Sequence, residues 1–302
     1  MLPFSRITVI GLGLIGSSIA RAVREYMPTA RVTGYDRDPA VREQSTLLGF
    51  CHDIADSAGA SVTDADLVIL CVPVGAIGKV AAELADDLPA DCVVSDVGSS
   101  KAGVAEALAE ALPGIVIVPA HPVAGTEHSG PEAGFASLFQ DRWCIVTPCE
   151  QSNDTAVAQV TSFWERIGAK VETMDPKHHD LVLAVTSHLP HLIAYTIVGT
   201  ASDLEDVTQS EVIKYSAGGF RDFTRIAASD PTMWRDVFLA NKDAVLEMLQ
   251  RFSEDLTRLQ RAIRWGDGDT LFELFSRTRA VRRSIIEQGQ DDARPDFGRS
   301  HS

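Results

Sequence analysis

The chain has 302 residues, 45% of them hydrophobic, which is enough for two domains with substantial cores. Its formal net charge of -15 argues against a nucleic-acid-binding protein and disfavours docking on an anionic membrane. The five cysteines stand singly without a CxxC pair, so we expect buried, reduced thiols. The first predicted strand begins at Arg6, which leaves no room for a signal peptide, and a cytoplasmic protein is therefore expected.

The first half of the chain alternates short Val/Ile-rich runs with helical patterns. The predicted strands lie at 6–11, 31–36, 66–73, 92–98, 114–122, 143–148 and 170–175. Helical segments are expected at 75–87, 101–112 and 154–168. Nearly continuous apolar strands that alternate with helices are typical of a parallel sheet covered on both faces. Residues 1–176 are therefore predicted to form a doubly wound α/β domain.

The second half is predicted to be all-helical. After Pro176 the strand patterns disappear and apolar residues recur at helical spacing, which indicates five or six helices over 177–288. The most apolar of them, "LVLAVTSHLPHLIAYTIVG", contains two histidines and a proline, so we expect a core helix rather than a membrane span. The polar tail 289–302 is expected to be disordered.

A glycine-rich loop directly follows the first predicted strand and opens a helix. Its residues are Gly11, Leu12, Gly13, Leu14, Ile15 and Gly16. In this G-x-G-x-x-G pattern the first glycine permits a tight turn and the second lets the backbone approach a pyrophosphate. The third allows close helix–strand packing, and the helix N-terminus attracts the anion. The loop predicts a Rossmann-type dinucleotide site.

The second predicted strand ends in Asp36, about 20 residues after Gly16, where a carboxylate can bind both ribose hydroxyls of an adenosine. This carboxylate would repel a 2′-phosphate, so NAD is predicted over NADP. Arg37 leaves an alternative open, because an arginine there can pair with that phosphate or stack over the adenine. Asp36 could also be a plain turn residue, although Asp38 and Pro39 explain the turn without it.

Ligands of an open α/β sheet bind beyond the carboxyl ends of its strands. At the end of strand 66–73, Val72 and Pro73 offer an apolar wall suited to a nicotinamide ring. At the end of strand 114–122, His121 precedes a proline, which holds the histidine in an extended conformation. We expect its side chain to lie near the nicotinamide.

Other polar residues have plain structural explanations. Ser100 and Lys101 fit a helix cap followed by ordinary helix residues. In "SHLPH", His188 and His191 share one helix face, but no carboxylate or cysteine pattern completes a metal site. No metal is therefore predicted, and His188 is expected to be a packed, hydrogen-bonded core residue. Pro190 should kink this helix because it frees a backbone carbonyl.

The segment "SAGGFRDFTRIAASDPTMWRD" carries two arginines, Arg221 and Arg225, one helical turn apart. Solvated ion pairs with Asp222 and Asp230 would explain them. However, aromatic residues interleave with the arginines, so we expect at least one guanidinium to border an apolar pocket.

Five segments, "GLGLIG", "DVGSSK", "HPVAGTEHSG", "SHLPH" and "GGFRDFTRIAASDPTMWRD", follow one another between Gly11 and Asp236. In these segments the chain resembles the prephenate/arogenate (cyclohexadienyl) dehydrogenases of tyrosine biosynthesis. The resemblance implies an NAD(P)-dependent oxidative decarboxylation in which a cyclohexadienol loses hydride and carbon dioxide and becomes a phenol. It also implies that the helical domain is a dimerisation unit, so a homodimer is expected.

The resemblance assigns three catalytic roles. His121 would hydrogen-bond the ring hydroxyl, Ser99 would support that same hydroxyl, and His191 would orient the substrate. The chemistry agrees with the first of these roles. Hydride can leave a carbinol carbon only as the hydroxyl proton departs, and imidazole titrates near the working pH.

The resemblance also implies substrate-binding residues. Arg225 would bind a substrate carboxylate, since its bidentate geometry can compensate for the repulsion between an anionic substrate and an acidic protein. Thr126 and Glu127 match an active-site loop, and Trp234 matches a tryptophan near the substrate. Arg221 is a further candidate, although the family often has lysine at that position.

Three alternatives stay open at this point. Prephenate and arogenate differ by a keto against an amino group, and no residue decides between them. A β-hydroxyacid dehydrogenase also joins a dinucleotide domain to a helical one, but that class relies on a helix-borne lysine and none occurs between 178 and 213. A non-catalytic NAD-binding sensor would reuse the fold and would need neither His121 nor Arg225.

Overall fold

The computed structural model describes residues 2–126, 128–204 and 217–287. The chain divides into two compact units, the first made of Met1–Pro190 and Ala228–Val245 and the second of His191–Ala227 and Leu246–Ser302. The predicted tail 289–302 lies outside the described residues.

The first unit is built on a six-stranded parallel sheet with the order β3-β2-β1-β4-β5-β6. Its strands are β1 (Arg6–Ile10), β2 (Arg31–Tyr35), β3 (Asp53–Ile54), β4 (Leu67–Leu70), β5 (Val93–Asp96) and β6 (Val116–Ile117). All of β4 and β5 and all but one residue of β1 are buried, as expected for strands covered on both faces. The predicted doubly wound sheet is confirmed; the two-residue strand β3 was not predicted.

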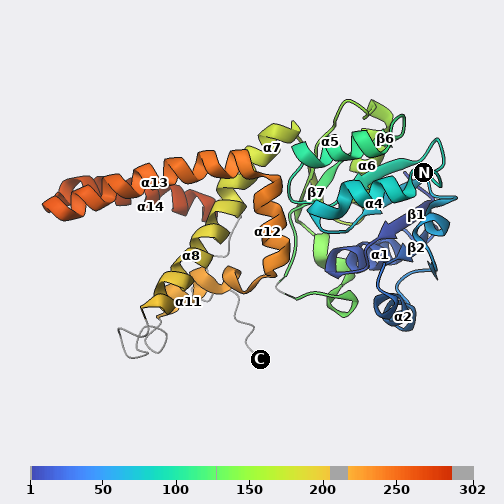
Figure 1. Cartoon of the computed structure of the whole chain (residues 1–302), viewed down its shortest axis with the longest axis horizontal. Helices are drawn as coiled ribbons and strands as arrows, with labels where there is room; N and C mark the ends of the chain where they lie inside the picture. The colour runs from blue at the N-terminus through green and yellow to red at the C-terminus, as the bar shows by residue number, and fades with distance from the viewer. Residues whose placement is uncertain (1, 127, 205–216, 288–302) are drawn as a thin grey trace. The chain divides into compact units, whose positions relative to one another are not determined.

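Helices flank this sheet on both sides (Figure 1). They are α1 (Leu14–Tyr26), α2 (Pro39–Leu48), α3 (Ala58–Val62), α4 (Ile77–Leu84), α5 (Ala102–Ala111) and α6 (Asp154–Arg166), with short 3₁₀ turns at Val74–Ala76, Pro131–Ala133 and Ala136–Phe139. Strand residues alternate between two apolar clusters. Val9 and Ile69 pack with α1 and α6, whereas Val68 and Leu70 pack with α4 and α5.

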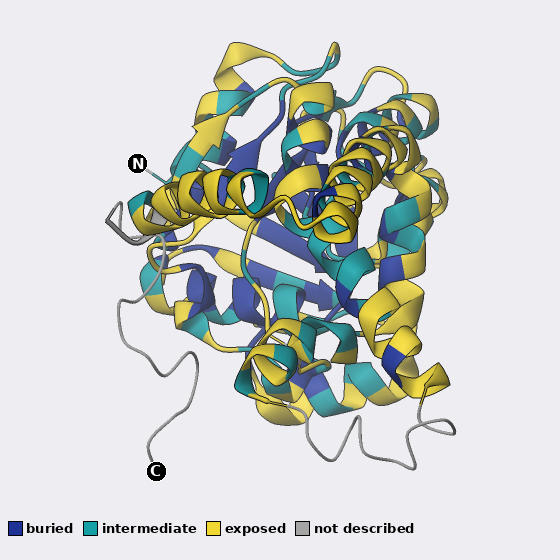
Figure 2. Cartoon of the chain, turned by 90° about the vertical axis from the view of Figure 1, so that its left-hand side faces the viewer, coloured by how far each residue is buried: buried dark blue, intermediate teal, exposed yellow. Residues whose placement is uncertain are grey.

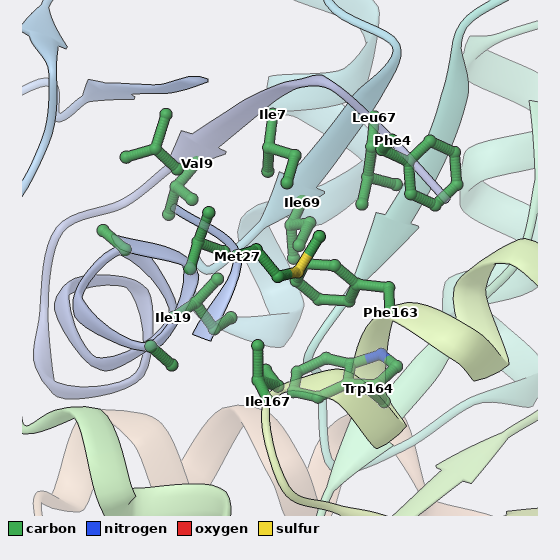
Figure 3. Packing of buried hydrophobic residues seen from close by; sticks show 14 of the residues in the cluster. Phe4, Ile7, Val9, Ile19, Met27, Leu67, Ile69, Phe163, Trp164 and Ile167 are labelled. Carbon is green, nitrogen blue, oxygen red and sulfur yellow. The ribbon is translucent and has the colours of Figure 1, made fainter. Parts of the chain in front are cut away.

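Aromatic side chains of α6 close the first of these clusters. Phe163 and Trp164 are fully buried, and their ring centroids lie 5.4 Å apart in an edge-to-face arrangement. Figure 3 shows them beside Ile19 and Met27 of the first βα unit. Buried residues gather on the strands and on the helix faces against them (Figure 2). Edge-to-face pairing adds to the burial of such large rings, so α6 is firmly anchored.

The prediction of a single strand over 114–122 is wrong. The chain leaves the main sheet after β6 and enters a separate three-stranded sheet of order β7-β8-β9, with β7 antiparallel to β8. These strands are β7 (Ala120–Pro122), β8 (Trp143–Val146) and β9 (Lys170–Thr173). Pro119 separates the two sheets, because it has no amide hydrogen to donate, while its carbonyl accepts from the Thr147 N–H at 2.9 Å. His121 therefore lies within the second sheet.

Helices dominate the chain beyond residue 176. They are α7 (Pro176–Leu183), a π-helical turn (Ala184–His188), α8 (Leu189–Asp203), α11 (Gly218–Thr224), a 3₁₀ turn (Arg225–Ala228), α12 (Pro231–Ala240), α13 (Lys242–Trp265) and α14 (Gly268–Glu287). A π-helical turn directly precedes Leu189 and Pro190, and in it the Leu189 N–H donates to the Ala184 carbonyl five residues earlier. The predicted domain boundary at residue 176 marks the end of the strands, but α7 and α12 belong to the first compact unit.

One helical stretch of the described chain, Pro176–Asp203, has the length and apolar composition of a membrane span, with a mean hydropathy of 1.6 in its most apolar window. Only 22% of that window is buried within the chain, which is less than a core helix would show. Length and composition alone are weak evidence for a membrane, because helices that bury their apolar face against other protein meet the same test.

Candidate active site

The glycine loop has the geometry that a dinucleotide requires. Gly11 has φ +95°, and a side chain there would place its Cβ 2.4 Å from the Cys71 carbonyl oxygen. A Cβ at Gly16 would lie 1.9 Å from the Gly11 carbonyl oxygen, so both positions admit only glycine. At Gly13, by contrast, no described atom lies within 4 Å of the Cβ position. This open approach to the backbone fits a pyrophosphate at the start of α1.

Asp36 stands directly after β2 and connects the acidic strand end to the glycine loop. Its two carboxylate oxygens accept from the Leu12 N–H and the Asp38 N–H, each at 2.9 Å. The half-buried carboxylate thus braces the loop and stays in position for a ribose. Arg37 is exposed, and Val72 and Pro73 follow β4 at the same edge of the sheet. These residues can hold NAD as the sequence predicts.

His121 on β7 begins a chain of buried side-chain contacts. Its Nδ1 lies 2.9 Å from Nε2 of His179, and the two rings meet edge to face. Nδ1 of His179 lies in turn 2.9 Å from the Asp180 carboxylate. All three side chains are buried, with His121 7% exposed. A buried imidazole linked through a second imidazole to a carboxylate is an arrangement suited to proton transfer.

The Asp180 carboxylate is held by the start of α5. One oxygen accepts from the Lys101 N–H at 2.7 Å and the other from the Ala102 N–H at 2.9 Å. A carboxylate at a helix N-terminus is stabilised by the unpaired N–H groups there. Asp180 and His179 are brought to this place by α7, which begins at Pro176 with Asp175 as its N-cap.

Lys101 is not an ordinary helix residue, and that expectation is wrong. Its side chain is completely buried and forms an ion pair with the equally buried Asp96 at the end of β5. Its Nζ also donates to the Ala120 carbonyl at 2.8 Å, directly before His121. A buried ammonium needs an anion and further acceptors to offset its desolvation. The pair therefore ties the end of β5 to β7, the strand that carries His121.

Burial sets the protonation of this cluster. It lowers the pKa of His121 well below its usual value. The positive charge of Lys101 acts in the same direction, as would a proton on His179 or His188. Burial also lowers the pKa of His179, against the opposing effect of its hydrogen bond to Asp180. Both imidazoles are therefore neutral at neutral pH, the state in which His121 can accept a proton.

A second polar group packs beside this cluster. Asn241, at the end of α12, donates to the Asp180 carbonyl at 2.8 Å and lies 3.1 Å from Nδ1 of His188. His188 is fully buried, as expected for a hydrogen-bonded core histidine. Its ring meets that of Trp234 on α12 edge to face, with ring centroids 6.1 Å apart, and Trp234 is itself buried.

The structure places the remaining predicted residues separately. Ser99 is half-buried between β5 and α5, and Thr126 is exposed on the loop after β7. Glu127 lies outside the described residues. His191 is half-buried on α8, Arg221 is exposed on α11, and Arg225 is exposed at the start of the 3₁₀ turn that follows α11. These last three belong to the second compact unit.

Sequence reasoning missed His179, Asp180 and Asp96. The segment "DPKHHD" does carry a helix-start signal, an aspartate N-cap followed by proline, and two adjacent histidines. Nothing in this short stretch shows which histidine is buried. The structure buries His179 and leaves His178 exposed.

A glycine loop at the start of α1, an acidic end to β2 and a doubly wound sheet together define a dinucleotide-binding protein of the Rossmann type. A family model described as the prephenate dehydrogenase nucleotide-binding domain matches residues 19–173. A second, described as the prephenate dehydrogenase dimerization domain, matches residues 175–277. Together these models cover most of the chain.

Known proteins agree with the family models. A cyclohexadienyl dehydrogenase from Zymomonas mobilis is 45% identical over 98% of this chain and 100% of its own length. The crystal structure of a prephenate dehydrogenase from Aquifex aeolicus with hydroxyphenyl propionate and NAD+ gives a TM-score of 0.88 at 33% identity, covering 93% of this chain and 98% of that one. A Synechocystis arogenate dehydrogenase gives 0.80 at 26% identity, covering 93% and 99%. The chain belongs to the prephenate dehydrogenase family.

Proposed function

We propose that His121 is the proton acceptor in an NAD-dependent oxidative decarboxylation of prephenate and/or arogenate. The observation that carries this role is the buried, neutral imidazole of His121, held through His179 and Asp180 in the unit that also carries the glycine loop. The reaction is that of the family to which the chain belongs. It places the protein in tyrosine biosynthesis.

In the proposed reaction one proton moves from the substrate to His121 and back to the product. His121 takes the proton of the ring hydroxyl while the carbinol carbon loses its hydride, and the carbinol becomes a carbonyl. NAD, when bound, accepts that hydride. The carbonyl then draws electrons through the ring, so the bond to the carboxylate breaks, carbon dioxide leaves and the ring becomes aromatic. The resulting phenolate oxygen takes the proton back from His121, and no net proton is released.

Other residues of the chain receive supporting roles. Ser99 would hydrogen-bond the same ring hydroxyl, and His191 would orient the substrate. Thr126, Glu127 and Trp234 would line the substrate site. Val72 and Pro73 would form the wall beside the nicotinamide. The segments that resemble the family support these assignments.

Arg225 would bind a substrate carboxylate. Arg225→Ala is expected to raise KM about 10- to 100-fold with little change in kcat, because a charge-assisted hydrogen bond contributes about 1.5–3 kcal/mol. Steady-state kinetics with the preferred substrate measure this. Arg221→Ala, four residues earlier, is the matched comparison and should shift KM less. Normal saturation in the Arg225 variant would remove that residue from the carboxylate site.

Exposed apolar side chains support a homodimer. On α13 and α14 they are Leu246, Leu256, Ile263, Trp265, Phe272, Phe275 and Val281. The Pro176–Asp203 stretch adds Leu181, Val185, Ile197 and Val198. Apolar area on this scale is covered by protein in soluble oligomers, and two copies of one chain are the usual solution. A second copy of the chain would cover these apolar side chains, so they do not require a membrane. We therefore place the enzyme in the cytoplasm.

The wild-type enzyme tests the function directly. NADH formation is followed with prephenate and with arogenate, each with NAD and with NADP. We expect turnover with at least one of the two substrates and faster turnover with NAD, because Asp36 disfavours a 2′-phosphate. An enzyme that reduces NAD with neither substrate would contradict the proposal, and a preference for NADP would assign Arg37 to the cofactor phosphate.

A further inference from the structure

We infer that His179 and Asp180 are positioning residues that hold His121 in one tautomer, with its proton on Nδ1 and its Nε2 kept as a bare acceptor. This inference deepens the proposed function, since it rests on His121 being the base. It assigns a task to two residues that no motif singled out.

Asp180 determines the first step. Its carboxylate accepts two backbone N–H groups from the start of α5, at 2.7 and 2.9 Å. The oxygen that accepts from Lys101 is also the one 2.9 Å from Nδ1 of His179. A carboxylate in this setting has only acceptors to offer. Nδ1 of His179 must therefore carry a proton and donate it.

His179 determines the second step. Its fully buried ring has a lowered pKa, so it carries a single proton, which is already committed to Asp180. Its Nε2 is therefore an acceptor, and among the described residues its hydrogen-bond partner, 2.9 Å away, is Nδ1 of the His121 imidazole. Nδ1 of His121 must then be the donor. The other ring nitrogen of His121 is left with its lone pair, as a base requires.

Charged and titratable groups of the neighbouring elements surround the His121–His179–Asp180 row of side chains. Lys101 from the start of α5 and His188 from the π turn both disfavour a proton on His121. Asp96 at the end of β5 opposes Lys101, and the Cys144 thiol on β8 has a pKa raised well above its usual value, so it stays neutral. Asp180 is therefore the one anion that the chain places in hydrogen-bond contact with His179 among the described residues.

The same geometry affects the reaction itself. When Nε2 takes the substrate proton, the positive charge on the His121 ring is shared through the Nδ1–H bond with His179 and balanced by Asp180. That support favours the imidazolium only while the proton is in transit. The same tautomer also determines where the proton goes afterwards. Because Nε2 accepts the proton from the substrate oxygen, Nε2 can return it to that oxygen. An imidazole in the opposite tautomer could accept no proton there.

The tautomer can be read without turnover. Histidine side chains labelled with ¹⁵N distinguish protonated from bare ring nitrogens by NMR, and the His121 signals are those lost in His121→Asn. In the wild-type protein we expect a protonated Nδ1 and a bare Nε2. In His179→Leu we expect a mixture or a switch toward a protonated Nε2, because Leu cannot accept from Nδ1. A wild-type His121 with its proton on Nε2 would overturn the inference.

Kinetics supply the second measurement. His179→Leu is expected to lower kcat about 10²- to 10³-fold with an unchanged Kd for NAD. His179→Gln should recover about tenfold of this loss, because its amide oxygen can accept from His121 Nδ1 where the ring nitrogen did. Asp180→Asn should resemble the Leu variant. The matched control is His178→Leu on the same helix, which is exposed and should retain wild-type kcat.

The outcomes separate the inference from the function it rests on. Equal activity of His179→Leu and the wild type, with His121→Asn inactive, would contradict the positioning role of His179. It would still support His121 as the base. Equal loss in the Leu and Gln variants would also count against it, since a purely structural role would not depend on the acceptor. If the wild type turned over neither substrate, the NMR result would still report the tautomer.

Discussion

His121→Asn is expected to keep the wild-type Kd for NAD and to lower kcat by about 10²- to 10⁴-fold, the range that a general base contributes. The side-chain amide fills a similar volume but cannot take up a proton. The glycine loop and Asp36 lie on other elements, so the nucleotide site should be unaffected. Fluorescence titration with NAD and steady-state turnover measure the two effects separately.

The pH profile identifies the same group. Because burial and the neighbouring Lys101 ammonium lower the pKa of His121 well below its usual value near 6.5, the base stays unprotonated at neutral pH. Activity is therefore expected to persist below pH 6.5 and to fall only as the pH drops through this lowered pKa. The residual activity of His121→Asn should lack that acid limb. A kcat equal to the wild type, or a variant with the same acid limb, would argue that another group accepts the proton.

The nucleotide half of the site is accessible from sequence because its physics is local. A glycine that must adopt φ +95° and a carboxylate at the end of the next strand sit within one βαβ unit. Continuous apolar strands alternating with helices are enough to predict the parallel sheet. Even there, the separation of β7 from β6 depends on one proline and on pairing with β8, a strand more than twenty residues away.

The catalytic half is less accessible because its contacts join distant segments. Asp180 meets Lys101 across 79 positions, and His121 meets His179 across 58. Lys101 fits an exposed helix position by composition, and only the fold shows that the end of β5, the start of α5 and β7 enclose it. Local pattern therefore identifies His121 as a candidate, whereas its partners emerge from tertiary packing. These partners decide which protonation state it adopts.

Lys101→Met is expected to lower the free energy of unfolding by about 3–5 kcal/mol, because it leaves Asp96 a buried carboxylate without its cation. Urea unfolding at a fixed protein concentration measures this. The loss should be greatest at neutral pH. Without the ammonium the pKa of Asp96, already raised by burial, rises further, so the folded variant takes up a proton and regains stability as the pH falls.

Two further variants test whether the ion pair is the cause. In Asp96→Asn/Lys101→Met the buried charge is gone, so part of the lost stability should return, as expected when a buried pair is replaced as a whole. Lys79→Met removes an exposed lysine whose nearest carboxylate, on Glu83, lies 3.9 Å away, and should change stability by less than about 0.5 kcal/mol. A Lys101→Met penalty as small as that of Lys79→Met would show that the pair contributes little. In that case His121 would owe its position to the hydrogen bonds of β7 with β8 and to His179 alone.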